Sequence, residues 1–206
     1  MNKSIAVITS WLLHPLLMPT YLFILLQVFV PGALTPMDRS ISYYLLLLIF
    51  ITTCIIPVLS LLGLRGAASI SNLRLEKRKE RLLPFIFITV FYMVTAYMFN
   101  LRLNLNPILQ AIFLSISLVV LILTLLTIFW KISIHSAGVG GATAAFLALS
   151  FFFPEDGLYR PVCLMVLISG ITLTSRLKLN AHTPMEIYAG FCTGFIIVFS
   201  MLMLRS

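Results

Sequence analysis

Long apolar segments alternate with short polar ones along the whole chain. Six stretches contain no Asp, Glu, Lys or Arg, and a seventh, residues 179–204, contains Glu186 alone. Most of the seven reach the roughly 20 apolar residues that a helix needs to cross a bilayer. These stretches are residues 4–37, 40–64, 82–101, 103–130, 132–154, 161–175 and 179–204. The pattern predicts an all-α fold, a polytopic transmembrane helical bundle of six to seven spans. We favour seven, although the stretch at 161–175 is short.

The expected spans cover residues 5–31, 41–64, 84–100, 106–130, 138–153, 160–174 and 184–204. In the first span, Pro15 and Pro19 interrupt the backbone hydrogen bonds, so we expect a kink there. We interpret His14, beside this kink, as a packed or interfacial histidine. No small-residue cleavage site follows a short apolar region, so the first span is expected to be a retained helix and not a removed signal.

Composition supports a membrane protein. Of 206 residues, 61% are hydrophobic and 10% are charged, which excludes a soluble globule. We treat residues 1–206 as a single integral membrane domain. The net charge of +8 lies in short loops between spans, so anionic lipid headgroups or a phosphorylated substrate are the expected partners, and not nucleic acid. The three cysteines fall within predicted spans and show no metal-ligand spacing.

The longest polar stretch, residues 65–83, holds six of the fourteen Lys and Arg residues. As a whole it is typical of a basic helix at the membrane interface. Arg74 and Arg81 are seven residues apart, on nearly the same face of a helix, and can converge on one anion. For Arg81, which immediately precedes the third span, we favour a functional role.

The richest chemistry lies in residues 175–186, between the last two spans. Arg176 offers a fork of donors suited to phosphate oxygens. Four residues separate His182 from Glu186, so on a helix the carboxylate can bond one ring nitrogen and leave the other basic. Thr183 and Pro184 also predict a helix start in which Glu186 closes a capping box. Glu186 therefore serves as a cap alone, or as a cap that also orients the imidazole.

A second polar region precedes the fifth span and contains Ser133 and His135. It leads into small residues at Ala137, Gly141 and Ala145, a four-residue repeat that favours close helix packing. With seven spans, two separate this region from residues 65–83 and two more separate it from residues 175–186. All three polar regions are therefore expected at one membrane face, around one site.

These residues resemble the type 2 phosphatidic acid phosphatase superfamily, the membrane lipid-phosphate phosphatases, over roughly residues 74–186. The third motif of that family is Ser-Arg, five residues, His, three residues and Asp. Ser175, Arg176 and His182 match it, and Glu186 replaces the Asp.

The other two motifs of the family match less closely. Ser133 and His135 match its Pro-Ser-Gly-His motif, in which Ile132 and Ile134 replace the Pro and Gly. Arg74 and Arg81 keep the spacing of its first motif, Lys, six residues and Arg-Pro, with the Pro displaced to Pro84.

The resemblance implies a metal-independent hydrolase with no cofactor, acting on a lipid phosphomonoester or diphosphate through a phosphohistidine. It assigns the nucleophile to His182, its orientation to Glu186 and the general acid and base to His135. The phosphate would be bound by Arg74, Arg81, Arg176, Ser133 and the backbone N–H of Ile134. The implied partners are the phosphorylated lipid and the surrounding membrane lipids.

Two alternatives stay open: a lipid-carrier phosphotransferase with the same nucleophile, and a non-catalytic transporter or scaffold. Charged side chains near span ends disfavour transport. The motif-bearing face carries ten Lys and Arg residues against four on the other, which predicts a cytoplasmic site in a multi-pass cell (inner) membrane protein. The sequence does not specify which lipid phosphate is bound or the oligomeric state.

Overall fold

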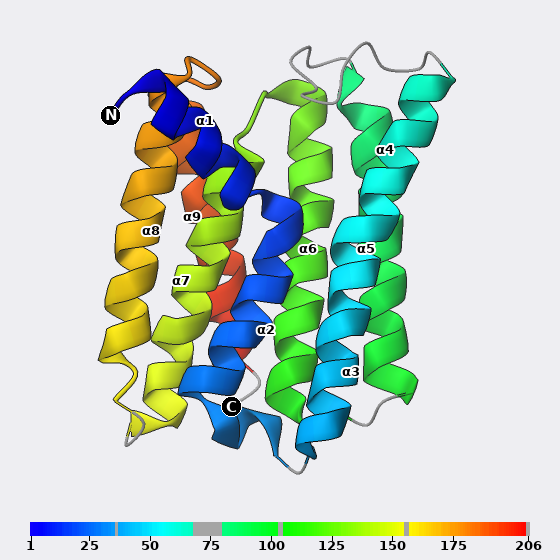
Figure 1. Ribbon diagram of the computed structural model, residues 1–206, viewed down its shortest axis with the longest axis vertical. Coiled ribbons are helices and arrows are strands. Elements are labelled where there is room, and N and C mark those ends of the chain that lie inside the picture. The colour runs from blue at the N-terminus through cyan, green and yellow to red at the C-terminus, as the bar shows by residue number, and fades with distance from the viewer. Residues whose placement is uncertain (36, 68–79, 103–104, 155–156, 205–206) are drawn as a thin grey trace.

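The computed structural model describes residues 1–35, 37–67, 80–102, 105–154 and 157–204. All regular structure in these ranges is helical. Seven helical stretches are long and apolar enough to cross a membrane, which confirms the preferred count. They are Lys3–Phe29, Arg39–Gly66, Leu82–Asn100, Pro107–Phe129, Ile134–Phe152, Tyr159–Lys178 and Pro184–Met203. They run alternately up and down in one bundle (Figure 1).

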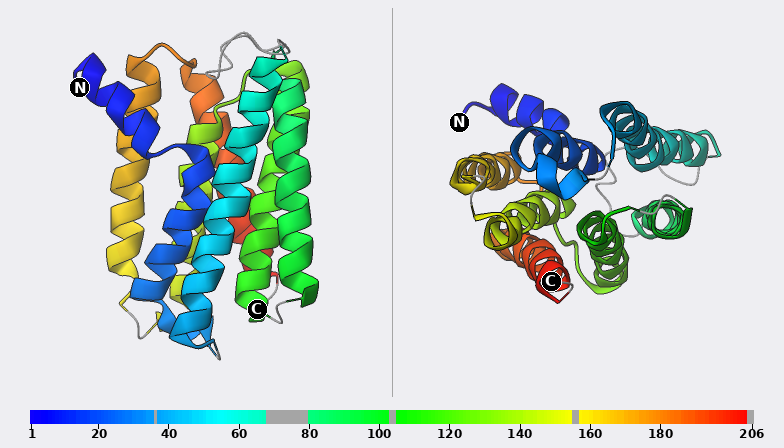
Figure 2. Two further views of the ribbon diagram at one scale, coloured as in Figure 1. Left: turned by 45° about the vertical axis from the view of Figure 1, so that its right-hand side comes forward. Right: turned by 90° about the horizontal axis from the view of Figure 1, so that it is seen from below.

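The first stretch is broken where the prolines predict a kink. Helix α1 (Lys3–Leu12) is followed by a 3-10 turn, η1 (Pro15–Leu17), and then by α2 (Met18–Phe29). The Tyr21 hydroxyl donates to the Leu12 carbonyl at 3.0 Å and replaces a backbone donor lost at the break. Helix α1 consequently turns away from α2 and lies obliquely against α8 (Tyr159–Lys178), as Figures 1 and 2 show.

The second stretch also contains an irregular turn with an identifiable cause. Helices α3 (Arg39–Phe50) and α4 (Ile56–Gly66) flank a π-helical turn, η3 (Ile51–Ile55), and a 3-10 turn, η2 (Pro31–Leu34), precedes α3. Pro57 has no N–H to donate to the carbonyl of Thr53. The hydroxyl of Tyr92, on α5 (Leu82–Arg102), donates to that carbonyl at 3.1 Å. The fold thereby satisfies a buried acceptor and ties α5 to the second span.

Helix α7 (Ile134–Phe152) is the most buried span and packs most closely on α9 (Pro184–Met203). A Cβ on Gly190 would collide with the Ser133 carbonyl, and one on Gly194 with that of Ala137. The small-residue repeat of α7 thus meets small residues on α9, which confirms the predicted close packing. Helix α6 (Pro107–Phe129) and α8 cover other sides of α7 (Figure 2).

Two helix ends differ from the predicted bounds by four residues. Helix α7 starts at Ile134 and not at 138, because the Ser133 hydroxyl accepts from the Ser136 N–H at 3.4 Å and caps the earlier turn. Helix α8 runs to Lys178 and not to 174, with Arg176 in its last turn, where a cation complements the helix dipole. The end of α4, the α6–α7 connection and the α8–α9 connection lie at the same end of the bundle, as expected (Figure 1).

Candidate functional site

The connection between α8 and α9 fixes the third motif in space. Asn180 has a φ of 49°, a left-handed conformation that Asn tolerates at a helix end. The Ala181 N–H donates to the Arg176 carbonyl at 3.2 Å, and the Asn180 N–H donates to the Leu177 carbonyl at 2.9 Å. These two bonds form a Schellman motif, which reverses the chain and brings His182 back over the end of α8.

Helix α9 starts with the predicted capping box. The Thr183 hydroxyl accepts from the Glu186 N–H at 3.4 Å, and the Glu186 carboxylate accepts from the Thr183 N–H at 3.1 Å. The same carboxylate lies 3.1 Å from His182 Nδ1. Glu186 therefore combines the two roles that the sequence leaves open, cap and partner of the imidazole.

The partners of His182 determine its tautomer. Nδ1 lies 3.0 Å from the Lys131 carbonyl as well as 3.1 Å from the Glu186 carboxylate. Both partners are acceptors, so Nδ1 carries the ring proton and Nε2 keeps its lone pair. The sequence indicates the carboxylate but not the carbonyl, which comes from another helix connection.

Charge and burial both favour a neutral His182 ring. Burial first, and then the positive charges of Arg81 and Arg176, lower the pKa of His182 to about 4, against an opposing effect of Glu186. Burial also lowers the pKa of Arg81, and the Glu186 carboxylate opposes that shift. His182 exposes 8% of its surface and Arg81 6%, so a basic nitrogen and a cation are held together away from water.

The α6–α7 connection links the second motif to the others through its backbone. The Ile132 carbonyl accepts from Arg81 Nη1 at 3.5 Å, and the Ser133 N–H donates to the Glu186 carbonyl at 3.1 Å. Ser133 is fully buried, and its hydroxyl accepts from the Ser136 hydroxyl at 2.9 Å. Its hydroxyl therefore serves the start of α7, and the first turn of α7 places the Ile134 backbone N–H at a positive helix end.

A residue outside all three motifs, Ser10 on α1, connects two of them. Its carbonyl lies 3.2 Å from His135 Nε2, and its hydroxyl accepts from Arg176 Nη1 at 3.3 Å. Since a carbonyl only accepts, Nε2 of His135 carries the proton and Nδ1 keeps the lone pair. Both His135 Nδ1 and Arg176 Nε are buried without a hydrogen-bond partner among the described residues. Such groups are available to a bound ligand.

His14 is a half-buried, packed histidine that lies beside the second motif. Its ring lies edge-on to that of His135, with centroids 5.4 Å apart, and its Nδ1 accepts from the Leu16 N–H at 3.4 Å. The one local signal is its place before Pro15, where the helix breaks and the side chain can cap the next turn. Its proximity to His135 depends on how η1 packs on α7.

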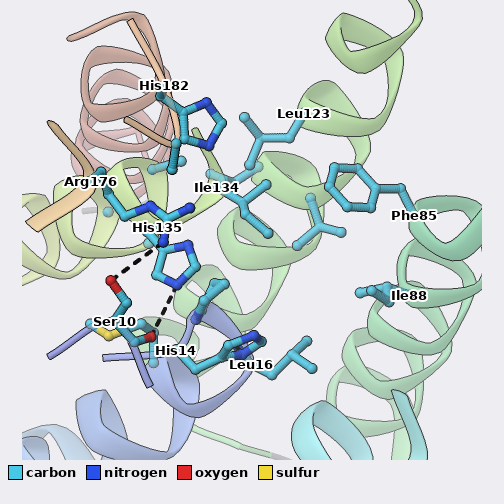
Figure 3. Close-up of a pocket in the computed structure, with 18 of the residues that line it drawn as sticks. Ser10, His14, Leu16, Phe85, Ile88, Leu123, Ile134, His135, Arg176 and His182 are labelled. Atoms are coloured by element: carbon cyan, nitrogen blue, oxygen red, sulfur yellow. Dashed lines mark hydrogen bonds between the residues drawn. The ribbon is translucent and has the colours of Figure 1, made fainter. Parts of the chain in front are cut away.

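One cavity of about 610 Å³ unites these groups, and Arg81, His135, Arg176 and His182 all line it. Figure 3 places Arg176 between the rings of His135 and His182, with Ser10 bonded to both Arg176 and His135. The two imidazoles that are 47 positions apart in the chain therefore share a pocket. Arg74, also expected here, lies outside the described residues.

No family model, curated protein or solved structure matches this chain. Within the described ranges, no three His, Cys, Asp or Glu side chains group in a way that could hold a metal ion.

The structure locates the two isoleucines that replace the Pro and Gly of the second motif. Ile132 is fully buried in the core, and Ile134 lines the cavity beside Phe85. Ile134 brings a bulky apolar side chain to a position where the motif has Gly. The site thus combines a polar end, containing two arginines and an imidazole with two acceptors at Nδ1, with apolar walls. The arginines of such a site can bind an anion, and its imidazole nitrogen can act as a nucleophile.

Proposed function

We propose that this chain is a membrane phosphatase that hydrolyses a lipid phosphomonoester or diphosphate through a phosphohistidine at His182. The observation that carries the proposal is the pair of acceptors on His182 Nδ1, which leaves Nε2 as a free nucleophile beside the buried Arg81 and the half-buried Arg176. A positioned nucleophile oriented by a third group is the usual arrangement for covalent catalysis.

In the first step, Nε2 of His182 attacks the phosphorus and the bond from phosphorus to the lipid oxygen breaks. The leaving alkoxide takes a proton from His135 Nδ1, which must be protonated at that point. The ring of His182 becomes cationic as the P–N bond forms, and the Glu186 carboxylate stabilises that charge through Nδ1–H.

In the second step, water attacks the phosphohistidine and His135 Nδ1 accepts a proton from it. The P–N bond breaks, inorganic phosphate forms, and His182 regains its lone pair. The bond from His135 Nε2–H to the Ser10 carbonyl persists in both steps, which keeps the other nitrogen aimed at the reacting groups.

Arg81 and Arg176 balance the negative charge of the phosphoryl oxygens, and the positive end of α7 adds the Ile134 N–H. Preorganised donors of this kind commonly contribute about 3 to 4 kcal/mol each to catalysis. By the Lys and Arg count, we place the site at the cytoplasmic face of a cell (inner) membrane. Labelling of a single Cys introduced near Lys131, in intact and broken cells, tests that placement.

Phosphate release by the purified protein tests the function. The panel comprises phosphatidic acid, phosphatidylglycerol phosphate, a polyprenyl diphosphate and phosphorylated lipid A. His182→Ala is expected to abolish release while the protein elutes as a folded species, and a chelator is expected to have no effect. Release that survives His182→Ala refutes the phosphohistidine mechanism.

A further inference from the structure

A break in the helical backbone joins α1 to the rest of the chain. The Leu13 N–H closes α1 by donating to the Thr9 carbonyl at 2.8 Å. The Leu17 N–H opens η1 by donating to the His14 carbonyl at 2.9 Å. Between these bonds, His14 is extended, with a φ of −65° and a ψ of 135°, and Pro15 follows it. The two helices therefore end and begin separately, and a few residues at such a junction commonly form a hinge.

Two faces of α1 have different surroundings. One face lines the cavity through Lys3, Val7, Ser10 and Trp11. The other face carries large apolar side chains that are more than half exposed, at Ile5, Ile8 and Leu12. Helix α1 lies at the outside of the bundle (Figure 2). On this side of the protein, α1 is therefore the wall between the cavity and the bilayer.

The contact of α1 with the bundle is small. It packs on α8, and of its ten residues only Ala6 and Ser10 are buried. Lipid chains are as apolar as these side chains, so burying so few apolar atoms gives α1 little preference for the docked position. The docked position therefore depends on close packing at Ala6 and on a few hydrogen bonds. Elements with such contacts are the ones that open locally in folded proteins.

The hydrogen bonds that dock α1 go to residues of the second and third motifs (Figure 3). The Ser10 hydroxyl accepts from Arg176, and the Ser10 carbonyl accepts from His135. The Ser175 hydroxyl lies 3.6 Å from the Met1 sulfur. When α1 is docked, Ser10 holds the His135 ring and the Arg176 guanidinium at once. When α1 undocks, both side chains lose that partner, so the docked state is the assembled site.

We propose that α1 is a hinged gate: it undocks from α8 to open the cavity sideways to the bilayer, and it docks again to complete the site through Ser10. Ser10 is thereby a positioning residue for His135 and Arg176. The proposal rests on the proposed phosphatase function for its effect on catalysis, but not for the movement of α1.

Thiol labelling tests the movement. A single Cys is introduced into a protein whose three native cysteines are replaced by Ala. Ala6→Cys places it at a fully buried position of α1, and Ser136→Cys is the matched control, fully buried near the same end of the bundle but in α7. Ile8→Cys, at a position of α1 that is 59% exposed, gives the rate of an accessible thiol on the same helix.

In lipid vesicles, N-ethylmaleimide is expected to label Ala6→Cys about tenfold or more faster than Ser136→Cys, and more slowly than Ile8→Cys, because only α1 opens locally. N-hexadecylmaleimide, which stays in the bilayer, is expected to give the same order, because the gate opens towards the lipid. Labelling of Ala6→Cys that is as slow as labelling of Ser136→Cys overturns the gate.

A wedge beneath α1 tests whether docking assembles the site. Ala6→Phe places a ring in the buried contact and holds α1 away from α8, and Ala6→Leu is a smaller wedge in case the first variant fails to fold. Ser4→Phe adds a ring at an exposed position of α1 that does not line the cavity. For phosphate release, kcat/KM is expected to fall about tenfold or more in Ala6→Phe, which loses both Ser10 contacts, and to stay within about twofold in Ser4→Phe.

Ser10→Ala provides a reading that general damage to the fold does not change. In the wild type it is expected to raise KM about fivefold, because docked α1 presents the hydroxyl to Arg176. In the Ala6→Phe background the same substitution is expected to change KM less than about twofold, because the hydroxyl is already away from Arg176. Equal effects of Ser10→Ala in the two backgrounds refute the role of docking.

The two measurements separate failure of the gate from failure of the phosphatase function. Labelling of Ala6→Cys at the expected rate, with no phosphate release from any lipid of the panel, refutes the function and supports the movement of α1. Phosphate release by a protein in which Ala6→Cys is as inert as Ser136→Cys refutes the gate and supports the function.

Discussion

Glu186→Gln separates the two roles of the carboxylate that caps α9 and contacts His182. Gln is as compatible with the capping box as Glu, so helix α9 should persist. The bond from His182 Nδ1–H changes from a charge-assisted to a neutral one. Charge-assisted bonds contribute about 1.5 to 3 kcal/mol and neutral ones about 0.5 to 1.5, so the loss is about 1 to 1.5 kcal/mol. The Glu186 side chain exposes only 12% of its surface, which limits screening by water.

That loss falls on the step in which the His182 ring becomes cationic, so kcat should fall about tenfold. The variant should unfold within about 0.5 kcal/mol of wild type in a detergent-compatible thermal assay. Glu186 raises the pKa of His182, so removing its charge lowers that pKa further below its value of about 4. The ring is neutral at pH 7 in both proteins, and a change in protonation cannot account for the slower rate.

Thr183→Ala is the matched control for this experiment. It removes the hydroxyl that accepts from the Glu186 N–H and leaves the pair of His182 and Glu186 in place. It should destabilise the protein by about 1 kcal/mol and leave kcat within twofold. The reasoning is refuted when Thr183→Ala slows phosphate release as much as Glu186→Gln, or when Glu186→Gln acts only through loss of folded protein.

Three further predictions follow from the site and its packing. Arg176→Gln removes a positive charge that lowers the pKa of His182. The acid limb of the pH profile of kcat/KM, near pH 4 in the wild type, should therefore move to higher pH. An unchanged limb contradicts the assignment of that limb to His182. Ser10→Ala removes an acceptor of Arg176 and should raise KM about fivefold, about 1 kcal/mol, with kcat within twofold. Gly190→Ala directs a Cβ into the Ser133 carbonyl and should lower the melting temperature and the activity together. Gly170→Ala places a Cβ in open space and should stabilise α8 by up to about 1 kcal/mol.

The sequence alone determined the spans, their common polar end and the capping box at Thr183. Each depends on local properties: the length of apolar runs, the alternation of spans across a bilayer, and the reach of a side chain within one helical turn. The sequence also predicted one of the two acceptors at His182 Nδ1, the Glu186 carboxylate, because Glu186 lies one helical turn away. The predicted helix bounds were less accurate, because Ser133 caps α7 and starts it earlier than the apolar pattern predicts.

Only the tertiary structure decided which distant groups complete the site. The Lys131 carbonyl reaches His182 because α6 and α9 pack side by side, and the Ser10 carbonyl reaches His135 because α1 lies against α8 while η1 packs on α7. Backbone carbonyls have no sequence signature, so no motif could have indicated them. The cavity has the same origin: each helix presents an ordinary apolar face, and a cavity exists only where the packing of several helices leaves space unfilled.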